Sequence, residues 1–293
     1  MAWTTSDRVM ALRGRHIAID VGVDTLDGWR RHISGRNASV VAFFGFLSIF
    51  PLMLAATTIL GFVLRDNEEL QKKIIEGALD EIPVIGRELA NDPTAIDGNI
   101  WVLLIGLGGA LWSATKAFAM IHVAQDDVWE VDVDHRAPMP VQRGRALLGL
   151  VIMGGAQIAN LAMATLIGAF DLPLGGRIPL YATALGINIV VLAAVFHALT
   201  SAHPTWRDVW PGAIPAGFAY VIIQQFGTDI VLRIMQNAGD TYGQFALVLG
   251  IVTWLSFLSI SAIMAVELNA AIIRRRDGSL DAVQPDTAQP DTA

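Results

Sequence analysis

Long apolar stretches separated by short polar segments dominate the pattern of this chain. An α-helix rises about 1.5 Å per residue, so roughly 20 apolar residues cross the ~30 Å hydrocarbon layer of a bilayer. Six stretches reach that length, and they cover residues 38–64, 100–124, 146–170, 178–200, 209–232 and 244–273. The pattern therefore predicts an all-α fold, a polytopic membrane bundle of six transmembrane helices.

The polar segments predict shorter helices. Residues 16–33 place apolar side chains at roughly helical spacing among charged ones, which predicts an amphipathic helix at the inner membrane interface. A solvated helix that packs on the cytoplasmic loops is the alternative. Between the first two spans, apolar residues recur every fourth position from Leu70 to Ile82 before Pro83, which predicts short helices in an outer loop.

The domain organisation follows from these stretches. Residues 1–37 form a cytoplasmic segment that holds the amphipathic helix, residues 38–273 form the six-helix transmembrane domain, and residues 274–293 form a tail. The tail ends in two copies of Gln-Pro-Asp-Thr-Ala. It offers too little apolar surface to fold, so we expect disorder there.

Composition narrows the function classes. Hydrophobic residues make up 54% of the 293 residues and charged residues only 16%, which agrees with a membrane protein. The chain has no cysteine, so disulfides, thiolate catalysis and cysteine-based metal sites are excluded. The formal net charge is −7, which argues against a nucleic-acid partner.

The distribution of Lys and Arg predicts the orientation. One side of the predicted bundle carries thirteen of these residues, and the other side carries five. The thirteen are Arg8, Arg13, Arg15, Arg30, Arg31, Arg36, Arg136, Arg143, Arg145, Arg207, Arg274, Arg275 and Arg276, against Arg65, Lys72, Lys73, Arg87 and Arg177. Cytoplasmic loops carry such an excess, so we expect both termini inside a plasma membrane and residues 65–99 outside.

Polar side chains within the spans are costly in hydrocarbon and are therefore functional candidates. They form a predicted polar path through the membrane that consists of Lys116, His197, Gln225, Asp229, Arg233 and Glu267. Lys116 and Glu267 come to a similar depth and could pair. The alternative is that Lys116 extends to the interface while Glu267 meets Arg274 or the headgroup zone.

The fifth span holds the most polar face. Gln225, Asp229 and Arg233 follow at intervals of four and so share one side of a helix. The alternative to a substrate contact is an ion pair in which Asp229 and Arg233 neutralise each other.

Two prolines interrupt predicted spans. Pro51 removes a helical hydrogen bond and collides with the carbonyl four residues earlier, so we expect a kink near Ser48, whose hydroxyl can reach the freed backbone. Pro215 is expected to bend the fifth span in the same way. Sequence alone leaves open whether these kinks are fixed or act as hinges.

The order of several motifs carries a family resemblance. The first span contains Ser48-Ile-Phe-Pro51 after an aromatic run, and the second contains Leu111-Trp112-Ser113 followed by Asp126-Asp127-Val128-Trp129. Pro204, Trp206 and Pro211-Gly212-Ala213 introduce the fifth span, and Tyr242-Gly243 and Val266-Glu267-Leu268 frame the sixth. This arrangement, over about residues 20–275, resembles the YihY / virulence factor BrkB family, historically named ribonuclease BN.

The resemblance implies an inner-membrane protein with six helices that is linked to envelope integrity and suspected of transport. This chain has Gln125-Asp126 where the family usually has Leu-Asn. The ribonuclease name requires a metal site or an acid–base set beside a basic groove. The six histidines form neither a His-x-His-x-Asp-His cluster nor a His-Glu-x-x-His pair, so we expect no enzyme, no metal and no cofactor.

Three function classes follow. A transporter or flippase-like protein for an amphiphilic or small anionic solute is the preferred interpretation, with membrane lipids and a small-molecule or lipid substrate as partners. A non-catalytic envelope scaffold protein is the alternative, and a ribonuclease is the third. The substrate, the direction, the coupling ion and a homo-oligomeric state are left open by the sequence.

Overall fold

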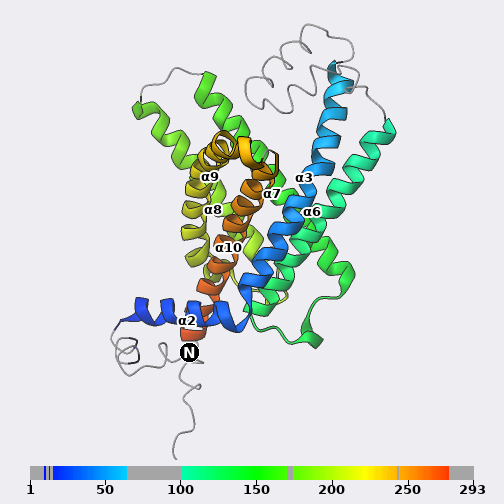
Figure 1. Cartoon of the computed structure of the whole chain (residues 1–293). Coiled ribbons are helices and arrows are strands. Elements are labelled where there is room, and N and C mark those ends of the chain that lie inside the picture. The colour runs from blue at the N-terminus through cyan, green and yellow to red at the C-terminus, as the bar shows by residue number, and fades with distance from the viewer. Residues whose placement is uncertain are drawn as a thin grey trace, which may run out of the picture. The chain divides into compact units, whose positions relative to one another are not determined.

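The computed structural model describes Met10, Arg13 and residues 16–64, 100–169, 174–242 and 244–276 (Figure 1). Every regular element in these residues is helical, and they contain no strand. The helices are α2 (Ile17–Arg31), α3 (Ser34–Leu64), α6 (Ile100–Val128), α7 (Met139–Ala169), α8 (Leu174–Ala198), α9 (Trp206–Tyr242) and α10 (Gln244–Arg276), and a 3-10 turn covers Val133–His135. The predicted all-α fold is thus confirmed.

The number of membrane spans is smaller among the described residues than the predicted six. Three helical segments there are long and apolar enough to cross a bilayer, namely Ile100–Val128, Ile178–Ala198 and Val248–Arg276. Ile17–Arg31 and Ser34–Pro51 pass the same test together, but they bend by 66° where they meet. If this bent pair is counted as one broken span, the described residues contain four candidate spans. The count of six stays a prediction. The expected outer-loop helices and residues 277–293 of the expected tail lie outside the described residues, whereas residues 274–276 of that tail belong to helix α10.

The chain divides into two compact units. The first comprises residues 1–43 and 117–293, and the second comprises residues 44–116. The boundary falls within α3 and α6, so each of these helices contributes one part to each unit.

In the first unit, α10 packs against both α9 and α2, α9 packs against α8, and α8 packs against α7. Its core is aliphatic and aromatic. Fully buried members include Phe196, Leu199, Val209 and Val266. Burying such side chains contributes about 1.5–3 kcal/mol each relative to exposure in water.

Helices α9 and α10 approach closely at Gly212. A Cβ atom there would overlap the carbonyl oxygen of Ala265. The Gly212 amide donates to Asn269 Oδ1 at 2.6 Å, and Asn269 Nδ2 donates to the Val209 carbonyl at 3.1 Å. Asn269 is fully buried, so one amide side chain joins the two helices through backbone groups.

In the second unit, α3 and α6 pack around Pro51. A Cβ atom on Gly109 would lie 3.1 Å from Pro51 Cβ, so the missing side chain makes room for the proline ring. Helix α3 continues through Pro51 to Leu64. The Ser48 hydroxyl donates to the Gly45 carbonyl at 2.6 Å rather than to the Leu47 carbonyl that Pro51 leaves without a donor, because a serine hydroxyl easily reaches back one turn of its own helix.

Candidate functional site

A buried carboxylate on α10 anchors the junction between α2 and α3. Glu267 has no exposed surface. His32 Nδ1 lies 2.9 and 3.1 Å from its two carboxylate oxygens, and the Ser34 hydroxyl donates to Oε1 at 2.6 Å. The His32 ring and the Ser34 hydroxyl thus give the buried carboxyl group polar partners, and such partners offset the cost of burying a polar group.

The other side of the His32 ring faces a second acid. His32 Nε2 lies 3.2 Å from Glu130 Oε1 and 3.4 Å from Arg31 Nε, while Arg31 itself binds Glu130 at 3.0 Å. The His32 side chain is only 7% exposed. We call Asp24, His32, Ser34, Glu130, Glu267 and Arg274 the Glu267 cluster.

Two further ion pairs fasten α2 to the end of α10. Arg274 donates through Nε and Nη2 to Asp24 Oδ2 at 3.1 and 3.0 Å, and Arg275 pairs with Asp20. Asp24 and Arg274 are largely buried. Arg274 is therefore engaged with α2, and Glu267 has His32 and Ser34 as partners. The expected contact between Glu267 and Arg274 stays a prediction.

The backbone beside His32 is strained. Ile33 has φ 52° and Glu130 has φ 53°, in the left-handed region that non-glycine residues rarely adopt. Such a conformation is unusual for a β-branched residue, and its cost is about 1–3 kcal/mol. The 66° bend between α2 and α3 falls at this point, so the contacts of the Glu267 cluster hold a strained connection in place.

A second buried cluster joins α6, α7 and the segment after α8, and we call it the Asp126 cluster. Asp126 is 1% exposed. Its carboxylate accepts from the Thr200 hydroxyl at 2.9 Å, the Ser201 amide at 2.6 Å and the Ser201 hydroxyl at 3.0 Å. These bonds satisfy backbone and hydroxyl groups where the chain leaves α8.

His122 extends this cluster toward α7. Arg145 donates through one guanidinium nitrogen to His122 Nε2 at 3.2 Å and to the Thr200 carbonyl at 2.6 Å. A guanidinium has no acceptor, so Nε2 carries no proton and the proton of the ring sits on Nδ1. That nitrogen lies 3.3 Å from Asp126 Oδ2 without a well-aligned hydrogen bond.

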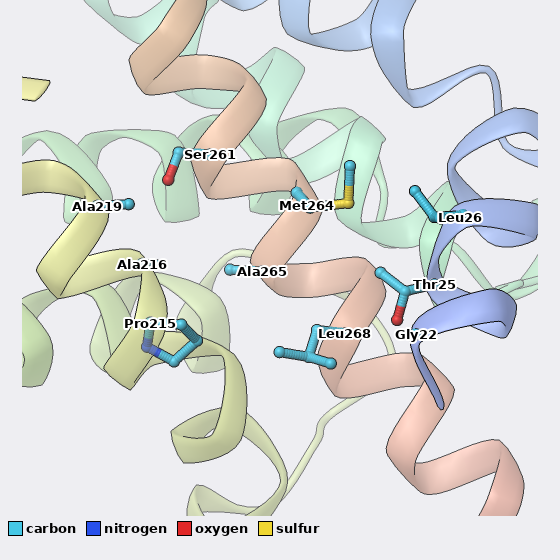
Figure 2. A pocket seen from close by; sticks show the side chains of 10 residues that line it. All are labelled: Gly22, Thr25, Leu26, Pro215, Ala216, Ala219, Ser261, Met264, Ala265 and Leu268. Atoms are coloured by element: carbon cyan, nitrogen blue, oxygen red, sulfur yellow. The ribbon is translucent and has the colours of Figure 1, made fainter. Parts of the chain in front are cut away.

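An apolar pocket of about 350 Å³ opens between α2, α9 and α10. Figure 2 shows Gly22, Thr25 and Leu26 from α2 on one side, Pro215, Ala216 and Ala219 from α9 on the other, and α10 between them. The α10 contribution is Ser261, Met264, Ala265 and Leu268. Pro215, one of the two predicted kink residues, thus lies on the pocket wall.

The structure accounts separately for two residues of the predicted polar path. His197 Nδ1 lies 2.8 Å from the Pro204 carbonyl oxygen, and the ring stacks on Trp206 at 4.6 Å. These contacts close the turn between α8 and α9. Lys116 extends over the Trp112 ring at 5.8 Å, and it belongs to the second compact unit.

Three further path residues lie beyond the described side chains. The side chains of Gln225, Asp229 and Arg233 on α9 lie outside the part that the structure describes. Of the path residues whose side chains the structure describes, Lys116, His197 and Glu267, none lines the apolar pocket. Within the described residues, no group of three or more His, Asp or Glu side chains could hold a metal ion.

Sequence reasoning missed most of both clusters. His32 and Glu267 are 235 positions apart, so their contact has no local signature. The sequence does contain one signal for the Asp126 cluster, which is the acidic pair Asp126-Asp127 at the end of an apolar stretch. Asp127 accepts from Asn37 at 3.1 Å and Arg136 at 2.9 Å, so both acids of this pair make specific contacts.

Comparisons with known proteins agree with the resemblance seen in the sequence. The chain is 24% identical over 260 residues to "Putative ribonuclease-like protein YfkH" of Bacillus subtilis, which covers 84% of this chain and 92% of that protein. It is 24% identical over 182 residues to "Inner membrane protein YhjD" of Escherichia coli, covering 60% of this chain and 49% of that protein.

No solved structure matches this chain. The family profile described as "Virulence factor BrkB" matches residues 25–290, which contain the Asp126 cluster and every residue that lines the apolar pocket except Gly22. Because that profile spans most of the chain and the helices include membrane-spanning lengths, this protein is a membrane-embedded member of the virulence factor BrkB family.

Proposed function

We propose that the protein is a transporter or flippase-like protein for an amphiphilic solute, and that the apolar pocket receives the hydrocarbon tail of that solute. The observation that supports this proposal is the apolar pocket. Its walls are apolar except for the Thr25 and Ser261 side chains, and a volume of about 350 Å³ falls within the ~300–1,000 Å³ range of ligand pockets.

The surroundings of the pocket favour an amphiphile over a purely apolar ligand. Helix α2 lines the pocket through Gly22, Thr25 and Leu26, and the same helix carries Asp20 and Asp24, which bind the arginines at the end of α10. Apolar and charged groups thus lie on one short helix. A molecule with a hydrocarbon tail and a polar headgroup matches that arrangement.

Pro215 supplies a physical reason for movement at this place. Proline cannot donate the helical hydrogen bond to the residue four positions earlier, which weakens the helix locally. A weakened α9 beside a tail-sized pocket is suited to widening and closing the pocket. The sequence leaves open whether Pro215 is a fixed kink or a hinge, and a hinge is part of this proposal.

The test uses purified protein in liposomes that contain a fluorescent phosphatidylglycerol. A membrane-impermeant quencher removes the fluorescence of the outer leaflet, and the measured quantity is the rate at which labelled lipid moves between the leaflets. Ala219→Trp fills the pocket, and Ala182→Trp, on the exposed surface of α8, is the matched control. We expect Ala219→Trp to lower the transfer rate by about tenfold or more because an indole occupies the tail position. The control should stay within about twofold.

Transfer no faster than in protein-free liposomes would contradict the transport proposal. A scaffold is the second candidate, and one observation favours it: Glu267, Asp126, Asn269 and Arg274 all have polar partners within the protein. A scaffold with a resident lipid would bind a photoreactive lipid at the pocket without transferring it. The absence of enzyme activity, the plasma-membrane location and the cytoplasmic termini remain expectations from the sequence.

A further inference from the structure

We propose that five uncharged polar side chains on α7, α8 and α9 bind the hydroxyl groups of a lipid headgroup while that headgroup crosses the bilayer. This inference rests on the proposed transport activity and names the headgroup chemistry that the activity accepts. We call the five side chains the Gln157 network, and they are Gln157 and Asn160 on α7, Asn188 on α8, and Tyr220 and Gln224 on α9.

A chain of hydrogen bonds joins these side chains. Asn160 Nδ2 donates to Asn188 Oδ1 at 3.0 Å and lies 3.5 Å from Gln157 Oε1. The Tyr220 hydroxyl donates to Gln157 Oε1 at 3.3 Å, and Gln224 Nε2 donates to the Tyr220 hydroxyl at 3.0 Å. The Gln157 network therefore runs across three helices that are separate in sequence.

The positions of these residues along their helices place the network at the depth of the bilayer centre. Asn188 lies at the middle of Ile178–Ala198, a segment that is long and apolar enough to cross a membrane. Gln157, which is joined to Asn188 through Asn160, lies near the middle of the apolar stretch 146–170. Hydrocarbon offers no hydrogen bonds, so each polar group at this depth needs a partner from the protein or from a ligand.

Two members of the network keep hydrogen-bonding capacity that the described residues do not use. Asn160 Oδ1 is a buried acceptor without a partner. The Gln157 side chain is exposed, and its oxygen accepts hydrogen bonds while its nitrogen donates to no described residue. Gly154 lies one helical turn earlier on the same side of α7, and a Cβ atom there would meet nothing within 4 Å. A free donor, a free acceptor and open space thus lie along one short part of α7.

The chemistry of the network selects hydroxyl groups. Four of its side chains are carboxamides and one is a phenol, so none carries a formal charge. A hydroxyl group both donates and accepts, so the hydroxyls of a ligand can accept from the Gln157 nitrogen and donate to Asn160 Oδ1. A headgroup that enters the bilayer loses its hydrogen bonds to water, and these side chains replace them. Amides that served only to join helices would leave neither group without a partner.

The test compares two fluorescent lipids in liposomes that contain the purified full-length protein. Phosphatidylglycerol has a headgroup with free hydroxyls, whereas phosphatidylpropanol with the same acyl chains has the same charge and no headgroup hydroxyl. We expect the native protein to transfer phosphatidylglycerol at least about fivefold faster than phosphatidylpropanol, because each hydrogen bond to the network is a modest net gain for the lipid that can form it.

Three variants assign this preference to the network. Gln157→Leu keeps most of the side-chain volume and removes the donor, so the ratio of the two rates should fall to about 1 while phosphatidylpropanol transfer stays within about twofold of native. Tyr220→Phe removes only the hydroxyl that binds Gln157 Oε1 and should give an intermediate ratio. Thr183→Val is the matched control and should keep the native ratio, because Thr183 is exposed on α8 and donates to the Pro179 carbonyl of its own helix at 2.8 Å.

The outcomes separate this inference from the transport proposal. Equal rates for the two lipids in the native protein would overturn the inference and leave transport intact. A Gln157→Leu protein that slows both lipids alike would make the network a packing contact between helices, which also overturns the inference. If neither lipid moves faster than in protein-free liposomes, the transport proposal itself fails, and the inference fails with it.

Discussion

At the scale of single residues, Gly28 determines whether the buried acid can reach its partners. A Cβ atom at Gly28 would lie 2.5 Å from Glu267 Oε2 and 3.3 Å from an Arg274 nitrogen. The Glu267 carboxylate thus occupies the space that any side chain at position 28 would fill. Gly22 lies on the same helix, and a Cβ atom there would meet nothing within 4 Å.

Gly28→Ala should therefore destabilise the protein, while Gly22→Ala should not. We expect Gly28→Ala to lower the free energy of unfolding by about 1–3 kcal/mol because the carboxylate must leave its hydrogen bonds to His32 and Ser34. Gly22→Ala should raise it by up to about 1 kcal/mol through helix propensity. Unfolding of both variants in mixed micelles measures the difference, and equal effects would contradict the assigned contact.

What the sequence could predict at this scale depends on where the partner of a residue lies. The cost of burying Glu267 in an apolar stretch is visible locally, so the sequence marks it as a candidate functional residue. The partner itself, His32, lies outside any predicted span. His197 shows the same limit, because its acceptor is the Pro204 carbonyl, a backbone group that carries no sequence signal.

At the scale of elements, the period of apolar residues predicts where helices form but not how closely they pack. Each predicted apolar stretch overlaps a helix. In the hydrocarbon core of a bilayer a helix is one of the few structures that can hydrogen-bond all of the backbone N–H and C=O groups. Close packing depends on pairs of positions in different helices. In the sequence Gly212 stands only within the Pro211-Gly212-Ala213 motif before the fifth span, whereas the structure places it against the Ala265 carbonyl.

Gly212→Ala tests this contact between α9 and α10. The added methyl group would overlap a backbone oxygen, which cannot rotate away as a side chain can, so the helices must separate and the bonds of Asn269 to Gly212 and Val209 must lengthen. We expect a loss of about 1–3 kcal/mol or more in the free energy of unfolding.

Gly186→Ala on α8 is the matched control, since a Cβ atom there meets nothing within 4 Å. It should be neutral or slightly stabilising. Thermal unfolding in one detergent compares the two variants. A Gly212→Ala protein as stable as the control would mean that α9 and α10 tolerate a wider spacing than the structure has.

At the scale of the whole molecule, charge and hydropathy together predict which segments face each side of the membrane. The excess of Lys and Arg in alternate loops assigns an orientation without any knowledge of packing. Three described helical segments, or four with the bent pair, have the length and composition of a span. The remaining predicted spans depend on composition alone, so their number needs a direct measurement.

Cysteine labelling provides that measurement because the native chain has no cysteine. Asn67→Cys lies in the loop predicted to be outside, and Ser279→Cys lies in the tail predicted to be inside. With a membrane-impermeant maleimide, we expect Asn67→Cys to react in intact cells and Ser279→Cys to react only after the membrane is permeabilised. Six spans with the N-terminus inside require this result. Labelling of Ser279→Cys in intact cells would place the tail outside and thereby rule out the predicted arrangement of six spans with both termini inside.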